Sequence, residues 1–108
     1  MGHDITAHWL DKKSETGYRE ESHAYLRYNA FYGGAGELYD LLGASKYNGG
    51  PSGIGDGCKV SKQKVVAALD HFCKKRVDGE ECFAELSFLA TILTEWWPGA
   101  RSVYIHFG

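Results

Sequence analysis

The chain has 108 residues and a formal net charge of −2, from 12 Lys and Arg against 14 Asp and Glu. This length fits one compact domain and leaves little room for a second. The near-neutral balance argues against a protein whose main task is to grip nucleic-acid backbones, because such proteins usually carry a strong basic excess. Hydrophobic residues at 44% and charged residues at 24% are close to the globular average and argue against wholesale disorder.

Membrane insertion and secretion are not expected from the sequence. It contains no apolar run long enough to cross a bilayer, and its first residues lack the basic and apolar regions of a secretory signal. The three cysteines, Cys58, Cys73 and Cys82, do not have the Cys-x-x-Cys spacing of a zinc site. We therefore expect reduced thiols in a cytoplasmic protein that has no cofactor.

Three segments alternate apolar and polar residues with the period of two that is typical of half-buried strands. The first covers residues 4–10 and the second residues 23–29. The polar stretch 11–17 between them ends in glycine and predicts a hairpin connection. The third strand, residues 103–107, closes the chain, and we expect it to pair beside the hairpin.

Between the second and third strands, apolar residues recur at helical spacing instead. The first helix is expected over residues 35–42, with Gly43 ending it in the left-handed conformation. The second is expected over residues 62–76, with Ser61 as its N-cap. Its predicted apolar stripe consists of Val65, Val66, Leu69, Phe72 and Cys73.

A third helix is expected after Asp78, which would be its N-cap, and Pro98 with Gly99 would end it. Its predicted apolar face consists of Cys82, Phe83, Leu86, Leu89, Ala90, Leu93, Trp96 and Trp97. The order strand, strand, three helices, strand predicts an α+β fold. In this fold about three helices pack on one face of a small, mostly antiparallel, three-stranded sheet.

The segment 47–57, Tyr-Asn-Gly-Gly-Pro-Ser-Gly-Ile-Gly-Asp-Gly, holds five of the 14 glycines. Glycine costs backbone entropy and adds no core contact, so such a cluster needs a reason. One reason is a run of tight turns, and the other is close approach of backbone amides to a bound group. The segment leads into the second helix, whose N-terminus favours an anion. Its spacing matches neither the Walker A loop nor the dinucleotide-binding pattern.

The first functional hypothesis is a non-enzymatic binding protein for a small anionic ligand, such as a phosphate- or nucleotide-like group. The glycines would permit close backbone approach, Tyr47 would offer a stacking surface, and two lysines would add charge. The predicted ligand-binding residues are Tyr47, Gly49, Gly50, Ser52, Gly53, Gly55, Gly57, Lys59, Ser61 and Lys62. The alternative for this segment is a structural or mobile surface loop without a ligand.

Short motifs along most of the chain resemble a group of small single-domain proteins that open with Met-Gly-His-Asp and close on a Phe-Gly strand. The motifs are Met1-Gly-His-Asp-Ile5, Ala24-Tyr-Leu-Arg27, Asn29-Ala-Phe31, Leu38-Tyr39, Leu42-Gly43, Tyr47, Gly50-x-Ser-Gly53 and Tyr104-Ile-His-Phe-Gly108. Members often carry a cysteine where Gly50 or Pro51 stands here, so no thiol role is implied at that position. The resemblance implies a single domain and no particular activity.

Catalytic and metal-binding alternatives rest on a few residues. Cys58 precedes a helix N-terminus and could act as a nucleophile if a histidine served as its base. The spacing of the sequence does not place a histidine beside it, so we do not expect an enzyme. Cys73 and Cys82 are expected in the core. If the first and last strands pair, His8 and His106 share the outward face, where a histidine metal site is conceivable but a solvated histidine is more common. The other histidines in or beside strands are His3 and His23.

The second functional hypothesis is an interaction or structural module that assembles as a homodimer through aromatic surface. Trp96 and Trp97 are adjacent, and neighbouring helical residues point about 100° apart. Both can therefore be buried only if a second layer, from the glycine-rich segment or another subunit, covers one of them. The aromatic residues Tyr25, Tyr28, Phe31 and Tyr32 could in principle stack on bases. Without a basic groove we expect core packing for them and no nucleic-acid partner.

Overall fold

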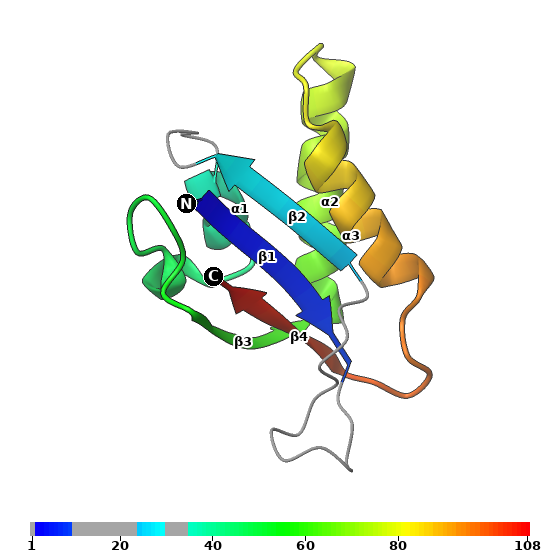
Figure 1. Ribbon diagram of the computed structural model, residues 1–108. Helices are drawn as coiled ribbons and strands as arrows, with labels where there is room; N and C mark the ends of the chain where they lie inside the picture. The colour runs from blue at the N-terminus through cyan, green and yellow to red at the C-terminus, as the bar shows by residue number, and fades with distance from the viewer. Residues whose placement is uncertain (1, 10–23, 30–34) are drawn as a thin grey trace.

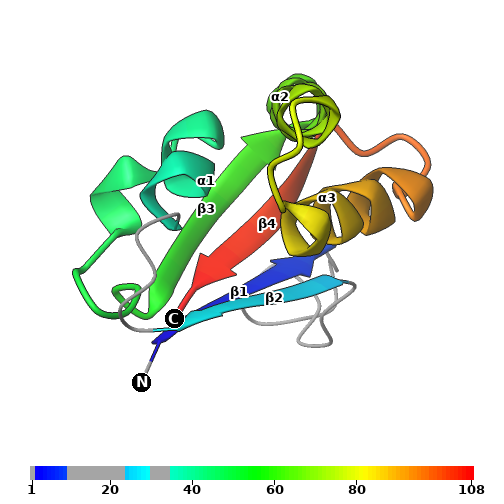
Figure 2. The ribbon, with the colours of Figure 1, turned by 90° about the horizontal axis from the view of Figure 1, so that it is seen from above.

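The computed structural model describes residues 2–9, 24–29 and 35–108. The strands are β1 (Gly2–His8), β2 (Ala24–Asn29), β3 (Asp56–Ser61) and β4 (Ser102–Phe107). The helices are α1 (Ala35–Leu41), the 3₁₀ turn η1 (Ser45–Tyr47), α2 (Lys62–Val77) and α3 (Phe83–Thr94). All strand pairs are antiparallel in the order β2-β1-β4-β3, and the α-helices lie on one face of the sheet (Figures 1 and 2).

The predicted α+β class is confirmed, but the sheet has four strands rather than three. The missed strand is β3, which follows the glycine-rich segment and pairs only with β4. Its sequence, Asp-Gly-Cys-Lys-Val-Ser, has little apolar alternation, because an edge strand buries few side chains. The expected pairing of the first and last strands is confirmed, with Ile5 opposite Phe107. The predicted connection 11–17 lies outside the described residues.

Two local capping predictions are confirmed. Gly43 has a φ angle of 69° and ends α1, where the N–H of Ala44 donates to the carbonyl of Tyr39 at 2.8 Å. This bond belongs to a Schellman motif, which needs a left-handed residue just after the helix. At the other cap, the hydroxyl of Ser61 accepts from the N–H of Lys64 and begins α2.

The predicted start of the third helix at Asp78 is wrong, because this part of the chain ends α2. Gly79 has a φ angle of 88°, and the N–H of Glu80 donates to the carbonyl of Lys75 at 3.1 Å. The same Schellman arrangement that closes α1 therefore closes α2. α3 begins five residues after Asp78, at Phe83, and ends at Thr94, before the predicted Pro98-Gly99 stop.

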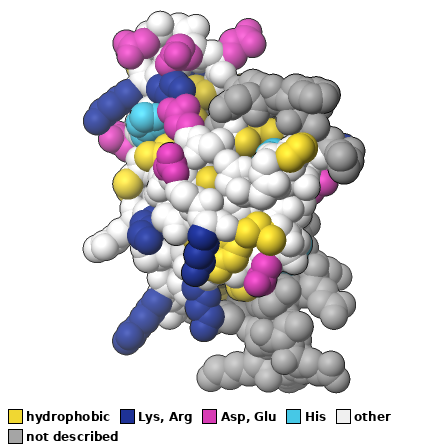
Figure 3. Space-filling view, turned by 90° about the vertical axis from the view of Figure 1, so that its left-hand side faces the viewer, with side chains coloured by type: hydrophobic (Ala, Val, Ile, Leu, Met, Phe, Trp, Pro, Cys, Tyr) yellow, Lys and Arg dark blue, Asp and Glu magenta, His cyan; other side chains and the backbone are white. Residues whose placement is uncertain are grey.

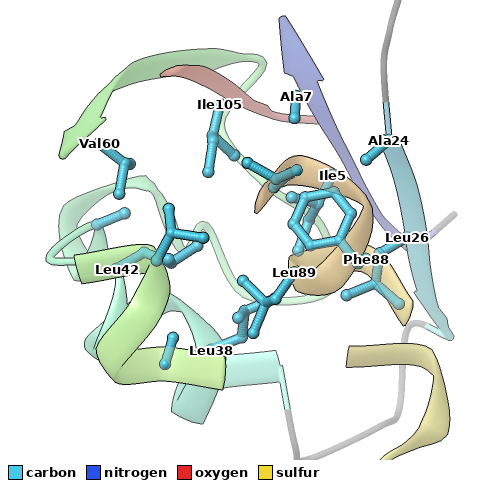
Figure 4. Close-up of a cluster of buried hydrophobic side chains, with 14 of the residues drawn as sticks. Ile5, Ala7, Ala24, Leu26, Leu38, Leu42, Val60, Phe88, Leu89 and Ile105 are labelled. Carbon is cyan, nitrogen blue, oxygen red and sulfur yellow. The ribbon is translucent and has the colours of Figure 1, made fainter. Parts of the chain in front are cut away.

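The core lies between the sheet and the helices (Figure 4). Strand residues such as Ile5 and Ile105 meet Leu38 and Leu42 from the α1 region and Leu89 from α3. The helical faces differ from the predicted stripes. On α2, Val65, Ala68 and Phe72 are buried, whereas Val66 and Cys73 are exposed. On α3, the buried residues are Glu85, Phe88, Leu89 and Ile92, whereas Phe83 is exposed.

These differences have one cause. Both helices carry more apolar residues than one face can bury, and their neighbours decide which ones face inward. Within the described ranges, no helix is both long and apolar enough to pass through a membrane.

Candidate functional site

The glycine-rich segment 47–57 forms a tight turn that runs beside the end of β4 (Figure 1). The N–H of Gly53 donates to the carbonyl of Gly108 at 3.2 Å, and the N–H of Gly55 donates to that of Phe107 at 2.8 Å. The N–H of Ile54 donates to the carbonyl of Tyr47 at 3.1 Å. These amides therefore stabilise the protein's own backbone, and a ligand would have to displace those bonds to use them.

Two of the glycines have a specific steric or conformational role. A Cβ atom on Gly57 would lie 2.1 Å from the carbonyl oxygen of Ile105, so only glycine lets β3 approach β4 this closely. Gly55 has a φ angle of 81°, and with Asp56 it lies opposite the single residue Phe107. Two residues opposite one, with glycine at the positive φ angle, is the arrangement of a β-bulge.

A buried histidine connects the segment to the rest of the molecule. His3 is only 3% exposed and lies on the helix side of the sheet. A carbonyl oxygen can only accept, so Nε2–H of His3 donates to Gly50 at 2.8 Å, and Nδ1 accepts from the hydroxyl of Tyr39 at 2.9 Å. Burial raises the pKa of Tyr39 to about 12, so this hydroxyl stays protonated at neutral pH. His3 thus joins β1, α1 and the glycine-rich segment.

The histidines do not form a common site. His8 and His106 lie on the sheet face away from the helices, as predicted, whereas His3 lies on the opposite face. Nε2 of His8 is 2.7 Å from the hydroxyl of Thr6. Among the described residues no group of three His, Cys, Asp or Glu side chains could hold a metal ion, and His23 lies outside them.

The charged and aromatic residues predicted for the anion site point in different directions. The ring of Tyr47 stacks on Phe107 at 5.7 Å between ring centres. Lys59 alternates with buried Val60 and therefore lies on the open face of the sheet. Nζ of Lys62 lies 5.4 Å from the ring centre of Trp96. The remaining predicted residues belong to two elements. Gly57 and Ser61 are on β3, and the turn before it contains Gly49, Gly50, Ser52, Gly53 and Gly55.

Two other lysines lie near Cys58: Lys64, which the sequence places with Lys59 and Lys62 as basic charge beside the start of the second helix, and Lys46, which was not predicted. This half-buried thiol lies on the helix side of β3, and burial raises its pKa overall. The ammonium groups of Lys46 and Lys64 are close enough to lower the same pKa, and the carboxylate of Asp56 is close enough to raise it. Neither lysine makes an ion pair with a residue in the described part of the chain. Lys and Arg side chains gather on the lower half of the face that carries β3 (Figure 3).

The two lysines come from one element that was not predicted and one that was. Lys46 belongs to η1, which precedes the glycine-rich segment, and Lys64 belongs to the first turn of α2. Only the packing of α1 against α2 and of β3 beside them brings the two together. Nζ of Lys64 also lies close to Gly43, at the C-terminal end of α1, where the helix dipole favours a cation.

The other two cysteines differ in exposure. Cys73 is exposed on α2, so its predicted place in the core is wrong. Cys82 is buried as predicted, and its thiol donates to the carbonyl of Phe72 at 3.1 Å. None of the three cysteines is in a disulfide.

The aromatic residues do not form one surface. Trp96 packs edge-on against Trp9, with ring centres 4.7 Å apart, so Trp9 covers it rather than the glycine-rich segment. Trp97 is 42% exposed. Tyr25 is exposed on the open face of the sheet and Tyr28 is buried on the helix face, so these two cannot stack on neighbouring bases. Phe31 and Tyr32 lie outside the described residues.

In comparisons with known proteins, no family model, no curated protein and no solved structure matches the chain. The resemblance to the Met-Gly-His-Asp group therefore remains an expectation from short motifs.

Proposed function

We propose that the protein is a non-enzymatic binding protein that holds a small anion, such as a phosphate group, at the N-terminal end of α2. The observation that carries the proposal is the convergence of Lys46 and Lys64 on Cys58. Two ammonium groups without a carboxylate partner in the described part of the chain repel each other, and an anion between them would relieve that repulsion.

The start of α2 supplies further donors. Its first backbone N–H groups have no acceptor within the helix, and Ser61 satisfies only that of Lys64. Together with the helix dipole, the remaining N–H groups favour a negative charge at this end. In this proposal the glycine-rich segment positions the site, because the hydrogen bonds of Gly53 to Gly108 and of Gly55 to Phe107 hold the connection between η1 and β3 in place.

The first test is a titration with inorganic phosphate and with adenosine monophosphate, followed through the backbone amide NMR signals. We expect both to shift the signals of Lys62 and Gln63, and the double variant Lys46→Gln, Lys64→Gln to bind at least about tenfold more weakly. The control is Lys74→Gln at the other end of α2, which should bind like the wild type. Unchanged binding by the double variant would contradict the proposal.

A second test uses Cys58 as a reporter of local charge. Iodoacetate is an anion and iodoacetamide is neutral, so a site that attracts anions raises the ratio of their alkylation rates. We expect this ratio to be higher at Cys58 than at exposed Cys73, and to fall when phosphate is added or both lysines are replaced. Equal ratios at the two cysteines would mean that Lys46 and Lys64 do not attract anions to Cys58, and would contradict the proposal.

The second proposal is a homodimer that assembles through exposed aromatic residues. The exposed aromatic residues Tyr25, Phe83 and Trp97 come from different elements. Sedimentation analysis over a range of concentrations tests it, and a monomer at all concentrations would remove it. A reducing, cytosolic location is proposed on the three unpaired thiols.

A further inference from the structure

An open cavity of about 560 Å³ lies between the edge strand β2, the last turn of α2 and the start of α3. The described residues that line it include Arg27, Arg76, Glu81, Phe83, Ala84 and Glu85. Its volume is within the range of roughly 300–1,000 Å³ that is common for small-molecule sites. It adjoins the C-terminal end of α2, so it is separate from the proposed anion site at the other end.

Glu85 is the unusual member of this lining. The residue is only 6% exposed, yet it makes no hydrogen bond or ion pair with any residue that the structure describes. Its carboxylate oxygens are not among the fully buried unpartnered atoms of the described residues, so they remain open to the cavity. In a capping box, a glutamate at the third helical position accepts from the N–H of the N-cap residue. No such bond from Cys82 is present in the described part of the chain, so the carboxylate faces the cavity without a partner.

Groups of the opposite sign surround the same cavity. Arg76 makes no ion pair with a described residue. The guanidinium of Arg27 points to the other face of the sheet, where it lies 3.8 Å from the carboxylate of Asp4. The first hydrogen bond within α3 runs from the N–H of Leu86 to the carbonyl of Cys82. The backbone N–H groups before it have no acceptor within the helix and favour an anionic group.

We propose that this cavity binds a small zwitterion of the α-amino-acid class. The ammonium group would lie against Glu85, and the carboxylate toward Arg76 and the first turn of α3. The lining offers a carboxylate from Glu85 and a guanidinium from Arg76, so a ligand that carries both signs of charge matches it best. In an α-amino acid the ammonium and carboxylate groups are attached to one carbon atom, so both can enter one small cavity. Phe83, 72% exposed at the cavity, offers an aromatic surface for an apolar side chain.

The test is a titration of the full chain with each standard L-amino acid at millimolar concentration, followed through the amide NMR signals of Ala84 and Glu85. The best binder is then compared with its decarboxylated amine and its deaminated acid. For L-phenylalanine these are 2-phenylethylamine and 3-phenylpropanoate. We expect each analogue to bind at least about tenfold more weakly than the amino acid, since each lacks one charge-assisted contact. If no amino acid shifts these signals, or if the analogues bind equally well, the proposal is overturned.

Variants separate a binding role of Glu85 from a purely structural one. Glu85→Gln should weaken binding of the amino acid and the amine about tenfold or more, while the melting temperature of the ligand-free protein is unchanged, because Glu85 makes no hydrogen bond or ion pair with a described residue that the change would remove. Arg76→Gln should weaken binding of the amino acid and the acid only. The control Glu80→Gln, beside the lining but not part of it, should bind normally.

A Glu85→Gln protein that binds normally and melts at a lower temperature would show that Glu85 only stabilises the helix, and the proposal would be wrong. Its failure would leave the anion site untouched, because that site depends on Lys46 and Lys64.

Discussion

His3 and Gly50, which are 47 positions apart in the sequence, are joined by a hydrogen bond of 2.8 Å from the imidazole to the backbone carbonyl. The same ring accepts from Tyr39, whose ring packs against Phe107 at 4.6 Å between centres. Phe107 in turn stacks on Tyr47, the first residue of the glycine-rich segment. A continuous set of buried aromatic contacts therefore holds the turn against the sheet and α1.

Replacing His3 with phenylalanine should lower the free energy of unfolding by about 1–3 kcal/mol, because the buried hydroxyl of Tyr39 would lose this partner and the turn at Gly50 would lose its hydrogen bond to β1. Urea denaturation measures the change. His106→Phe, on the open face of the sheet, is the control, and we expect a change within about 0.5 kcal/mol. Equal losses in the two variants would mean that the hydrogen bonds of His3 contribute nothing specific.

Gly57→Ala should be among the most destabilising single substitutions in the chain. The new Cβ atom would meet the backbone of β4, which cannot move without breaking the sheet, and we expect a loss of about 3 kcal/mol or more. Gly36→Ala, in α1, is the matched control. Its nearest neighbour would be the side chain of Asn48 at 3.7 Å, so alanine should stabilise the helix by about 0.5–1 kcal/mol. Thermal unfolding of both variants checks the opposite signs.

An ion-pair network between α1 and α2 should make stability depend on pH. Nζ of Lys75 lies 2.7 Å from the carboxylate of Glu37, which also contacts His71. The hydrogen bond from Lys75, followed by that from His71, lowers the pKa of Glu37. Its contribution is therefore fully present above the ordinary carboxyl pKa of 4.5 and is lost as the pH falls through the lowered value.

Glu37→Gln should accordingly flatten the acid limb of the stability curve and cost about 1 kcal/mol or less at neutral pH, because both side chains are partly exposed. Urea titrations at several acidic pH values measure it. Asp70→Asn is the control, since the pair of Asp70 with Lys74 is almost fully exposed. An acid limb that is equally steep in Glu37→Gln and the wild type would rule out this assignment.

The three thiols should react with a neutral alkylating reagent in the order Cys73, Cys58, Cys82. Cys73 is exposed, Cys58 is half-buried with a raised pKa, and Cys82 is buried with its thiol bonded to Phe72. Peptide mass spectrometry at increasing reaction times measures the order. Cys82 should become modified only when urea unfolds the chain, and early modification of Cys82 in the folded protein would contradict its placement.

The sequence predicted the features that depend on neighbouring residues. The left-handed cap at Gly43 and the N-cap at Ser61 need only local chemistry, and both are present. The first, second and last strands were visible because one face of each is buried, which forces apolar residues into alternate positions. The burial of Cys82 was also predicted correctly.

Much less of the candidate sites could be predicted from the sequence. The glycine-rich segment was noticed, but its amides are paired with β4, and that pairing could not be foreseen while β3 was missing. Lys46 and Lys64 come together only through the packing of α1, β3 and α2. The sequence analysis did not single out Glu85, and the burial of this residue depends on how α3 lies against β2.

Local sequence therefore determined where most helices and strands form and how two of the helices begin or end, because caps and periodicity act over a few residues. The tertiary structure decided which helical faces are buried, how the edge strand is paired and which charged groups meet. Those outcomes depend on contacts between segments far apart in the chain, and no short-range pattern encodes such contacts.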